Sequence, residues 1–207
     1  MKILFIDTET NGLPIDYKAS YTDVNNWPRV IALGWILADE TGKILRESHE
    51  LVLPNGWQVP TEEFWVKNGY RQDINQEKGI AIEVLLDALM EAKLEADLLV
   101  AHNLNFDHRI VWAEFIRSGK QPRSGMHKVC TMMKTTSVCK IPNTNRRGFK
   151  WPKLEELYEF LFKKKLGDAH QVSSDVTACM ECFYKLVEMG VIKLSDYVPV
   201  VDDFPFN

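Results

Sequence analysis

Apolar residues in the first quarter of the chain occur in short runs that are typical of buried β-strands. The runs are KILFID from Lys2, RVIALGWILAD from Arg29 and KILRESHELVL from Lys43, and the last two are separated by the turn ETG. Near-continuous apolar stretches bounded by turn residues indicate strands rather than helices. We therefore expect residues 2–7, 29–39 and 43–53 to form an antiparallel meander.

The remainder of the chain alternates helical and strand patterns. Residues 80–96, 105–119, 153–162 and 173–190 have apolar positions at spacings of three and four, which predicts amphipathic helices. Ser173 or Ser174 is the expected N-cap of the last helix. DLLVAHN and KVCTMM read as two further short strands. This order predicts an α/β fold with a mixed five-stranded sheet, an antiparallel meander plus parallel strands, flanked by helices.

Composition and charge narrow the class of protein. The chain has 207 residues, 45% of them hydrophobic and 26% charged, and a net charge of −4. This length suits one domain spanning 1–207, with a core over 2–190 and a C-terminal tail over 191–207. We find no uninterrupted apolar run of membrane-spanning length and no signal-peptide pattern, so we expect a cytoplasmic protein with no membrane partner.

Cys179 and Cys182 form a CxxC pair, which raises the question of zinc or redox chemistry. Both lie in a predicted helix, where a spacing of three places them on one face. Cys130 and Cys139 do not form a second CxxC that would complete a zinc site. Buried thiols are therefore the favoured interpretation, and a metal site or a disulfide is the alternative.

Two long irregular segments, 10–29 and 139–152, separate the predicted elements, and long loops in compact domains are often functional. Basic and aromatic residues are interleaved around the second segment: Lys140, Arg146, Arg147, Phe149, Lys150, Trp151 and Lys153. Such interleaving can follow a nucleic-acid backbone and stack bases. A solvated loop with an aromatic anchor is the competing interpretation, and composition alone favours it.

Two acids end the first apolar run. Asp7 and Glu9 are one residue apart, so on a strand both side chains point to the same face. Adjacent carboxylates repel each other unless a positive charge lies between them. The alternative is that Glu9 already lies in a solvated turn, because TNGLP follows it.

Two further motifs place acids at the ends of apolar elements. In AHNLNFD, a buried strand leads into a helix that carries Asp107 early, and in HQVSSD, His170 precedes Asp175 at the start of the last helix. Taken singly, Asp107 and Asp175 could be acids favoured by a helix N-terminus. Taken with Asp7 and Glu9, they make a set of four carboxylates and one histidine.

The order of FIDTETNGLP, AHNLNFD and HQVSSD resembles the motifs of the DEDDh family of 3′→5′ exonucleases, from Ile3 to about Val187. The resemblance implies a ribonuclease H-like fold and two divalent cations, Mg²⁺ or Mn²⁺. It assigns one metal to Asp7, Glu9 and Asp175, and a second metal to Asp7 with support from Asp107. His170 takes the place of the general base.

General chemistry agrees with these implied roles. Clustered carboxylates with no cysteine among them are hard oxygen ligands that select Mg²⁺ or Mn²⁺ over zinc. Two such ions can stabilise the attacking and leaving oxygens of a phosphodiester. Histidine titrates near neutral pH and suits proton transfer.

The resemblance also implies substrate contacts. Thr8, Glu9 and Thr10 lie where relatives hold the terminal 3′-hydroxyl and phosphate, and Leu13 lies where an apolar side chain wedges against the last base. Asn103 and Phe106 match positions that line the nucleotide pocket, although the spacing of Phe106 also fits a helix core. We treat His102 and His108 as structural. Together with the loop residues, the predicted substrate-binding set is Thr8, Thr10, Leu13, Asn103, Phe106, Arg146, Arg147 and Lys150.

The sequence therefore predicts a 3′→5′ exonuclease that releases nucleoside 5′-monophosphates from single-stranded DNA or frayed 3′ ends. An RNA-directed exoribonuclease of the oligoribonuclease type is the alternative, since 2′-hydroxyl recognition depends on pocket geometry. An inactive nucleic-acid-binding module and a ribonuclease H-type endonuclease fit the motifs less well. The expected partner is a nucleic-acid 3′ end, and the resemblance leaves polymerase association and a homodimer open.

Overall fold

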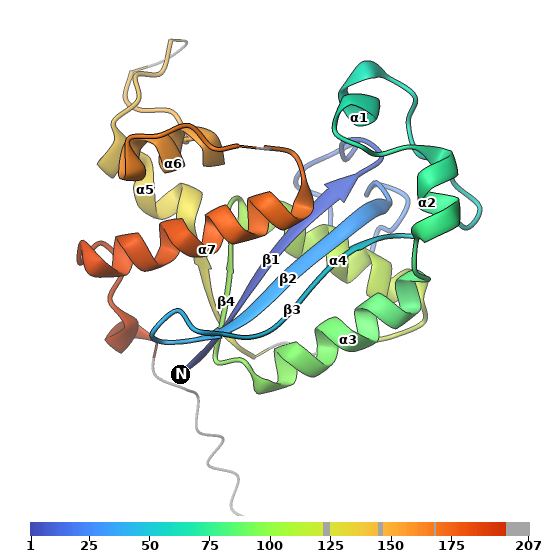
Figure 1. Cartoon of the computed structure of the whole chain (residues 1–207), viewed down its shortest axis with the longest axis horizontal. Coiled ribbons are helices and arrows are strands. Elements are labelled where there is room, and N and C mark those ends of the chain that lie inside the picture. The colour runs from blue at the N-terminus through green and yellow to red at the C-terminus, as the bar shows by residue number, and fades with distance from the viewer. Residues whose placement is uncertain (122–124, 145–146, 168, 198–207) are drawn as a thin grey trace, which may run out of the picture.

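The computed structural model describes residues 1–121, 125–144, 147–167 and 169–197, and its helices and strands follow the predicted order closely (Figure 1). Arg146 and the end of the C-terminal tail lie outside these residues. The elements are β1 Lys2–Thr10, β2 Val30–Asp39, β3 Ile44–Leu51, α1 Glu63–Lys67, α2 Gln72–Lys78, α3 Ile82–Glu95, β4 Leu98–Ala101, α4 Leu104–Arg117, β5 His127–Cys130, α5 Thr131–Cys139, α6 Leu154–Phe162, α7 Val172–Glu188 and η1 Leu194–Asp196.

In the described residues the strands form one sheet of five in the order β3-β2-β1-β4-β5. The pairs β1–β2 and β2–β3 are antiparallel, and β1–β4 and β4–β5 are parallel. This confirms the mixed sheet with a meander. The C-terminal end of the central strand β1 therefore lies beside the C-terminal ends of β4 and β5, where parallel α/β sheets gather functional groups.

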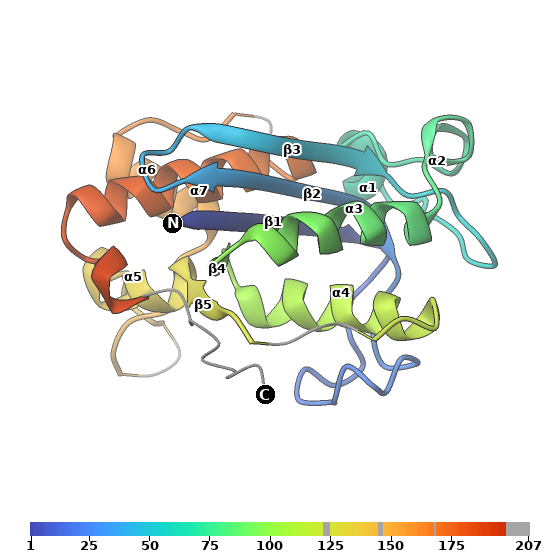
Figure 2. The same ribbon diagram turned by 90° about the horizontal axis from the view of Figure 1, so that it is seen from below.

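The alternating faces of β1 bury two separate cores. Leu4 and Ile6 pack with α3 and α4, whereas Ile3 and Phe5 pack with α7. Figures 1 and 2 show α3 and α4 along one face of the sheet and α7, with α5 and α6, on the other. Asp7 and Glu9 continue the series of odd-numbered residues that faces α7.

The expected strand KVCTMM is only partly correct. The strand β5 ends at Cys130, and Thr131 begins the helix α5. Threonine has a low helix propensity, which hides this helix from the sequence pattern. In the helix, the Thr135 and Thr136 hydroxyls donate to the carbonyl oxygens of Thr131 and Met132, at 2.7 Å and 3.1 Å, so these polar groups are satisfied within α5.

The expected cap of the last helix is also wrong. The helix α7 begins at Val172, before Ser173 and Ser174, and its N-cap residue is Gln171. Instead of a serine cap, the Asp175 carboxylate accepts a hydrogen bond from the His170 backbone N–H at 3.0 Å. This hydrogen bond, from a backbone N–H ahead of the helix to an acidic side chain in its first turn, resembles one half of a capping box.

Cys179 and Cys182 are free, fully buried thiols on α7, as the helical spacing predicted. Burial raises the pKa of Cys182 to about 12, which keeps this thiol protonated and unreactive. Within the described parts of the chain, no helix is long and apolar enough to span a lipid bilayer.

Candidate active site

Asp7 and Glu9 lie inside β1, which extends to Thr10, so the interpretation of Glu9 as a turn residue is wrong. A register shift between Glu9 and Thr10 then ends the regular pairing with β2. A bulge of this kind commonly re-aims side chains beside a functional site. Because side chains alternate along a strand, both carboxylates point to the same face as Ile3 and Phe5, the α7 face, at the end of the central strand.

The structure brings Glu9, His170 and Asp175 together. One potential ligand atom from each of these side chains lies within 4.8 Å of the others. Asp175 is in the first turn of α7, and His170 is in the loop before it. The His170 backbone has a φ of 69°, in the left-handed region, which non-glycine residues adopt at an energetic cost and which occurs often at functional sites.

Asp107 reaches the same cluster from α4. Its Oδ1 accepts hydrogen bonds from the Thr8 backbone N–H at 3.0 Å and from the Thr8 hydroxyl at 2.8 Å. The Thr8 side chain is therefore held by Asp107 in this structure and positions that carboxylate against β1. The second oxygen of Asp107 takes no part in these two bonds.

Burial raises the pKa of all four carboxylates, and repulsion within the cluster adds to the effect at Asp7, Glu9 and Asp107. Burial, followed by the charges of Asp107, Asp175 and Glu9, raises the pKa of Asp7 well above its usual range. Burial and the neighbouring aspartates raise the pKa of Glu9 to about 8. Burial is also the largest cause for the pKa of Asp107, raised to about 7, and of Asp175, raised to about 6.

This arrangement fits divalent cations. Asp7 Oδ2 is buried and has no hydrogen-bond partner within the described residues. A buried carboxylate oxygen without a partner is costly, and a bound cation would remove that cost. The donor set consists of carboxylate oxygens and one imidazole, which suits Mg²⁺ or Mn²⁺.

Two aromatic residues on α1 that the sequence interpretation missed lie next to the site, one in contact with His170 and one bonded to the end of β1. The ring of Phe64 on α1 contacts the His170 ring edge to face, with centroids 5.1 Å apart. Trp65 anchors α1 to the end of β1, because its Nε1 donates to the Thr10 carbonyl at 2.9 Å. Because α1 has only five residues, periodicity could not reveal it.

Tyr70 and Glu155 also belong to the surroundings of the site. Tyr70 is buried, and its hydroxyl accepts a hydrogen bond from the Val172 N–H at 3.2 Å. Burial, followed by the charge of Glu9, raises the pKa of Tyr70. Glu155 Oε1 lies 3.4 Å from His170 Nε2 and orients the imidazole. Neither residue lies in one of the three motifs, so the motif pattern alone could not reveal them.

Gly34 on β2 explains how α7 comes so close to the sheet. It pairs with Asp7 across the β1–β2 ladder, and a Cβ at this position would lie 2.8 Å from Val172 Cγ2 and 3.0 Å from the Val172 carbonyl oxygen. Only glycine leaves room for the first turn of α7 at this distance. That first turn carries Asp175 and follows His170.

We expect Gly34→Ala to displace the start of α7 and to impair catalysis together with stability. Overpacking of this kind costs about 1–3 kcal/mol of unfolding free energy, and a misplacement of about 1 Å at a reacting group can cost on the order of 10² in rate. Thermal unfolding and single-turnover hydrolysis of a labelled oligonucleotide measure the two effects. The control is Gly167→Ala, where an added Cβ meets open space. Unchanged turnover in Gly34→Ala would contradict a positioning role.

The predicted substrate-binding residues lie around this cluster in different situations. Leu13 is 72% exposed on the loop after β1, and the Thr10 hydroxyl donates to the Gly12 carbonyl at 2.8 Å. Asn103 is the N-cap residue of α4 with a left-handed φ of 69°, and Phe106 packs partly against the α4 side of the core.

The basic residues of the loop between α5 and α6 differ in whether they are paired. Arg147 is exposed, whereas Lys150 forms an ion pair with Glu156 at 2.5 Å, so this lysine is not free to bind a phosphate in this conformation. Phe149 and Trp151 are 43% and 59% exposed. The His102 ring contacts the Thr131 hydroxyl and the Pro152 carbonyl oxygen, at 2.9 Å and 3.0 Å, which is consistent with a structural role.

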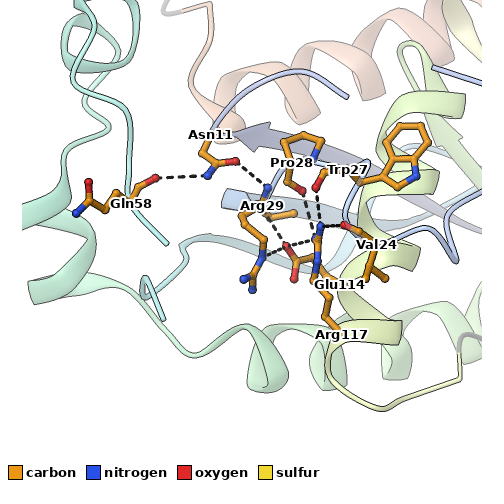
Figure 3. Close-up of polar contacts among 9 residues, drawn as sticks. Asn11, Val24, Trp27, Pro28, Arg29, Gln58, Glu114 and Arg117 are labelled. Carbon is orange, nitrogen blue, oxygen red and sulfur yellow. Dashed lines mark hydrogen bonds and ion pairs between the residues drawn. The ribbon is translucent and has the colours of Figure 1, made fainter. Parts of the chain in front are cut away.

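A buried ion network holds the loop that carries Leu13 (Figure 3). Glu114 Oε1 on α4 accepts from Arg29 Nε at 2.8 Å and from an Arg117 NH group at 2.9 Å. The Arg117 guanidinium also donates to the carbonyl oxygens of Val24, Trp27 and Pro28. These bonds fix the far end of the 11–29 loop to α4.

The near end of the same loop is fixed to the beginning of β2. The Asn11 N–H donates to the Arg29 carbonyl at 3.0 Å, and the Arg29 N–H donates to Asn11 Oδ1 at 2.8 Å (Figure 3). Hydrogen bonds thus hold both ends of the loop, and the exposed side chain of Leu13 lies two residues beyond Asn11.

A family model described as Exonuclease matches residues 4–183 of this chain. The chain belongs to this exonuclease family. The match confirms the resemblance inferred from the motifs, and it makes the chain a 3′→5′ exonuclease. The family depends on divalent metal ions, in agreement with the carboxylate cluster.

The chain is also similar to individual proteins. It is 28% identical over 181 residues to the DNA polymerase III subunit epsilon of Treponema pallidum (strain Nichols). The aligned region covers 87% of this chain and 74% of that protein. The crystal structure of E. coli exonuclease I in complex with a dT13 oligonucleotide superimposes with a TM-score of 0.69 at 16% identity, over 95% of this chain and 43% of that one. A moderately thermophilic exonuclease I from Methylocaldum szegediense gives a TM-score of 0.66 at 16% identity, over 90% of this chain and 40% of that one.

These structural matches confirm the expected ribonuclease H-like fold. The chain spans about two fifths of the length of the exonuclease I chains it matches. At this identity the likeness concerns the fold.

Proposed function

We propose that this exonuclease hydrolyses the 3′-terminal phosphodiester of single-stranded DNA, or of a frayed 3′ end, and releases nucleoside 5′-monophosphates. The observation that carries the proposal is the cluster of four carboxylates at the end of β1, with raised pKa values and one orphaned buried oxygen. Asp7, Glu9, Asp107 and Asp175 would hold two divalent cations. Those ions would supply positive charge to the attacking and leaving oxygens of the phosphodiester.

In this proposal His170 is the general base. Its imidazole accepts a proton from the attacking water, while the 3′-oxygen of the penultimate nucleotide leaves with the electrons of the broken P–O bond. Glu155, 3.4 Å from His170 Nε2, orients the ring and stabilises the imidazolium that forms. Asp175 holds the His170 backbone through the 3.0 Å hydrogen bond.

The surrounding residues would orient the strand. Leu13 is exposed on its anchored loop and would pack against the last base, and the Phe64 ring, in edge-to-face contact with His170, would flank the reacting phosphodiester. Phe106 and Asn103 would line the nucleotide pocket at the start of α4. Similarity to a DNA polymerase III subunit supports a polymerase as a partner.

Degradation of matched 5′-labelled oligonucleotides tests the proposal. We expect single-stranded DNA to shorten stepwise from its 3′ end with Mg²⁺ or Mn²⁺, and we expect chelator to stop the reaction until metal is restored. Chromatography of the products should show 5′-monophosphates.

The same assay has arms for single-stranded RNA and for blunt duplex DNA. Faster degradation of RNA than of DNA would replace the proposed substrate with RNA. Activity that is indifferent to chelation would overturn the metal mechanism, and internal cleavage products would overturn the exonuclease polarity.

A further inference from the structure

We propose that a basic pocket beside α4 binds backbone phosphates of the substrate strand upstream of its 3′ end. The inference rests on the proposed function and extends it to a second contact surface. The pocket has a volume of about 820 Å³ and is formed by the 11–29 loop, α4, β5 and α5. Its cationic residues are Lys18, Arg109, Lys128 and Lys134.

The charged side chains described around this pocket are all positive. Among the described residues that line it, none is an aspartate or glutamate. In the part of the chain that the structure describes, none of its four cations pairs with a carboxylate, whereas surface lysines such as Lys2 and Lys185 do. Four positive charges without a carboxylate partner, in a protein of net charge −4, create a local positive potential that attracts an anionic ligand.

Neutral partners hold two of these cations in place. Lys128 Nζ donates to His108 Nε2 at 2.8 Å, and the His108 ring stacks on Trp112 with centroids 4.2 Å apart. Arg109 Nε donates to Asn105 Oδ1 at 3.0 Å, and its guanidinium also bonds to the Ala19 carbonyl oxygen. The side chains are thus oriented without being neutralised, which leaves their charge available to a ligand.

The position of the pocket identifies that ligand as the substrate strand. Asp107 on α4 faces β1, and Asn105, His108 and Arg109 on another side of the same helix line the pocket. A helix is about 10–12 Å across, which corresponds to about three nucleotides at ~3.4 Å per nucleotide of a stacked strand. The pocket therefore lies within a few nucleotides of the site.

The 11–29 loop connects the two places. It begins directly after β1, which carries Asp7 and Glu9, and it carries Lys18, Ser20 and Tyr21 at the pocket. Figure 2 shows this loop below α4, on the side away from α3. Tyr21 adds an aromatic face beside the cations, and cations combined with aromatic residues are the usual means of binding single strands without sequence preference.

Binding of fluorescein-labelled oligothymidylates, followed by anisotropy in Ca²⁺ to prevent turnover, tests the pocket. For a strand of about 12 nucleotides, a site size typical of such grooves, the triple variant Lys18→Ala, Lys128→Ala, Lys134→Ala should bind on the order of 10²-fold more weakly at ~0.1 M salt. Its slope of log affinity against log salt should be shallower by about 2, since each single-strand phosphate contact contributes about 0.7.

A dinucleotide is too short to reach the pocket, so its hydrolysis should be the same in wild type and triple variant. The control removes the same charge from three exposed lysines outside the pocket, in Lys43→Ala, Lys78→Ala, Lys193→Ala. An unchanged salt slope, a loss equal to that of the control, or an equal loss for the dinucleotide would each overturn the assignment. If wild type fails to hydrolyse any substrate but the triple variant still loses strand binding, the exonuclease proposal fails and the pocket stands.

Discussion

Asp7→Ala is expected to abolish exonuclease activity while leaving the fold intact. Asp7 is the only carboxylate of the four whose pKa is raised by the charges of all three others, which places it at the centre of the cluster. Loss of the charge that the cations supply to the transition state costs several kcal/mol, so we expect turnover to fall by at least about 10³-fold. Release of nucleotides from a labelled single strand in Mg²⁺ or Mn²⁺ measures the loss.

A surface aspartate provides the control for this result. Asp87, which forms an ion pair with Lys120 at the surface, should tolerate replacement by alanine with full activity. Far-ultraviolet circular dichroism of Asp7→Ala should match that of wild type. Full activity in Asp7→Ala would contradict the metal assignment.

In the absence of metal, the carboxylate cluster should destabilise the folded protein as pH rises. An acid whose pKa is raised by folding stabilises the protein below its unfolded pKa, and this stability is lost as pH rises through the folded pKa. Because the pKa of Asp175 is raised to about 6, that of Asp107 to about 7 and that of Glu9 to about 8, the chelated wild type should lose stability between about pH 4 and pH 8.

Asp7→Asn removes one of the repelling charges and should flatten this decline. We expect the melting temperature of the chelated variant to exceed that of chelated wild type at pH 8, by about 2–4 °C for each kcal/mol of repulsion relieved. Mg²⁺ should restore the melting temperature of wild type far more than that of the variant. A melting temperature of chelated wild type that rises with pH over this range would contradict the repulsion.

His170→Ala is expected to reduce the rate of hydrolysis by on the order of 10²–10⁴, the usual contribution of a general base. Its imidazole lies within 4.8 Å of the Glu9 and Asp175 oxygens, and Glu155 and Phe64 fix its orientation. Single-turnover kinetics at saturating substrate separates this chemical step from binding. We expect strand affinity to change little.

A histidine outside the site is the matched control. His49 on β3 contacts Glu47 and lies in none of the motifs, so His49→Ala should keep the wild-type rate. A loss of less than tenfold in His170→Ala would remove this residue from the role of base. Thermal unfolding of both variants distinguishes a lost proton acceptor from a displaced start of α7.

The sequence predicted the long, strongly patterned elements well. The structure contains all three strands predicted from the apolar runs that begin at Lys2, Arg29 and Lys43, and all four predicted amphipathic helices. Their apolar periodicity was readable because it coincides with a buried face. The errors lie where local pattern is weak. The helix α5 is rich in threonine and reads as a strand, and α1 is too short for a period to appear.

The site divides in the same way. Asp7, Glu9, Asp107, His170 and Asp175 were predicted from the sequence because each lies in a short motif at the end of an apolar element, and the structure brings their side chains close together. Residues that act through distant packing were not found. Gly34 matters only because α7 crosses β2 at that position, and Glu155 only because α6 begins beside the His170 loop.

The sequence by itself thus determined the family and the kinds of chemical groups, since residue type and motif order are local properties of the chain. The repulsion between Asp7 and Glu9, which a solvated turn could have relieved, is retained because tertiary structure extends β1 through both residues and adds Asp107 and Asp175. Only the tertiary structure decided which side chains surround the acids. It also decided that, among the described residues, the lysine and arginine side chains of the pocket beside α4 have no carboxylate partner. Both features depend on contacts between elements far apart in the chain. Burial in particular, the largest cause of every raised pKa in the site, exists only in the folded protein.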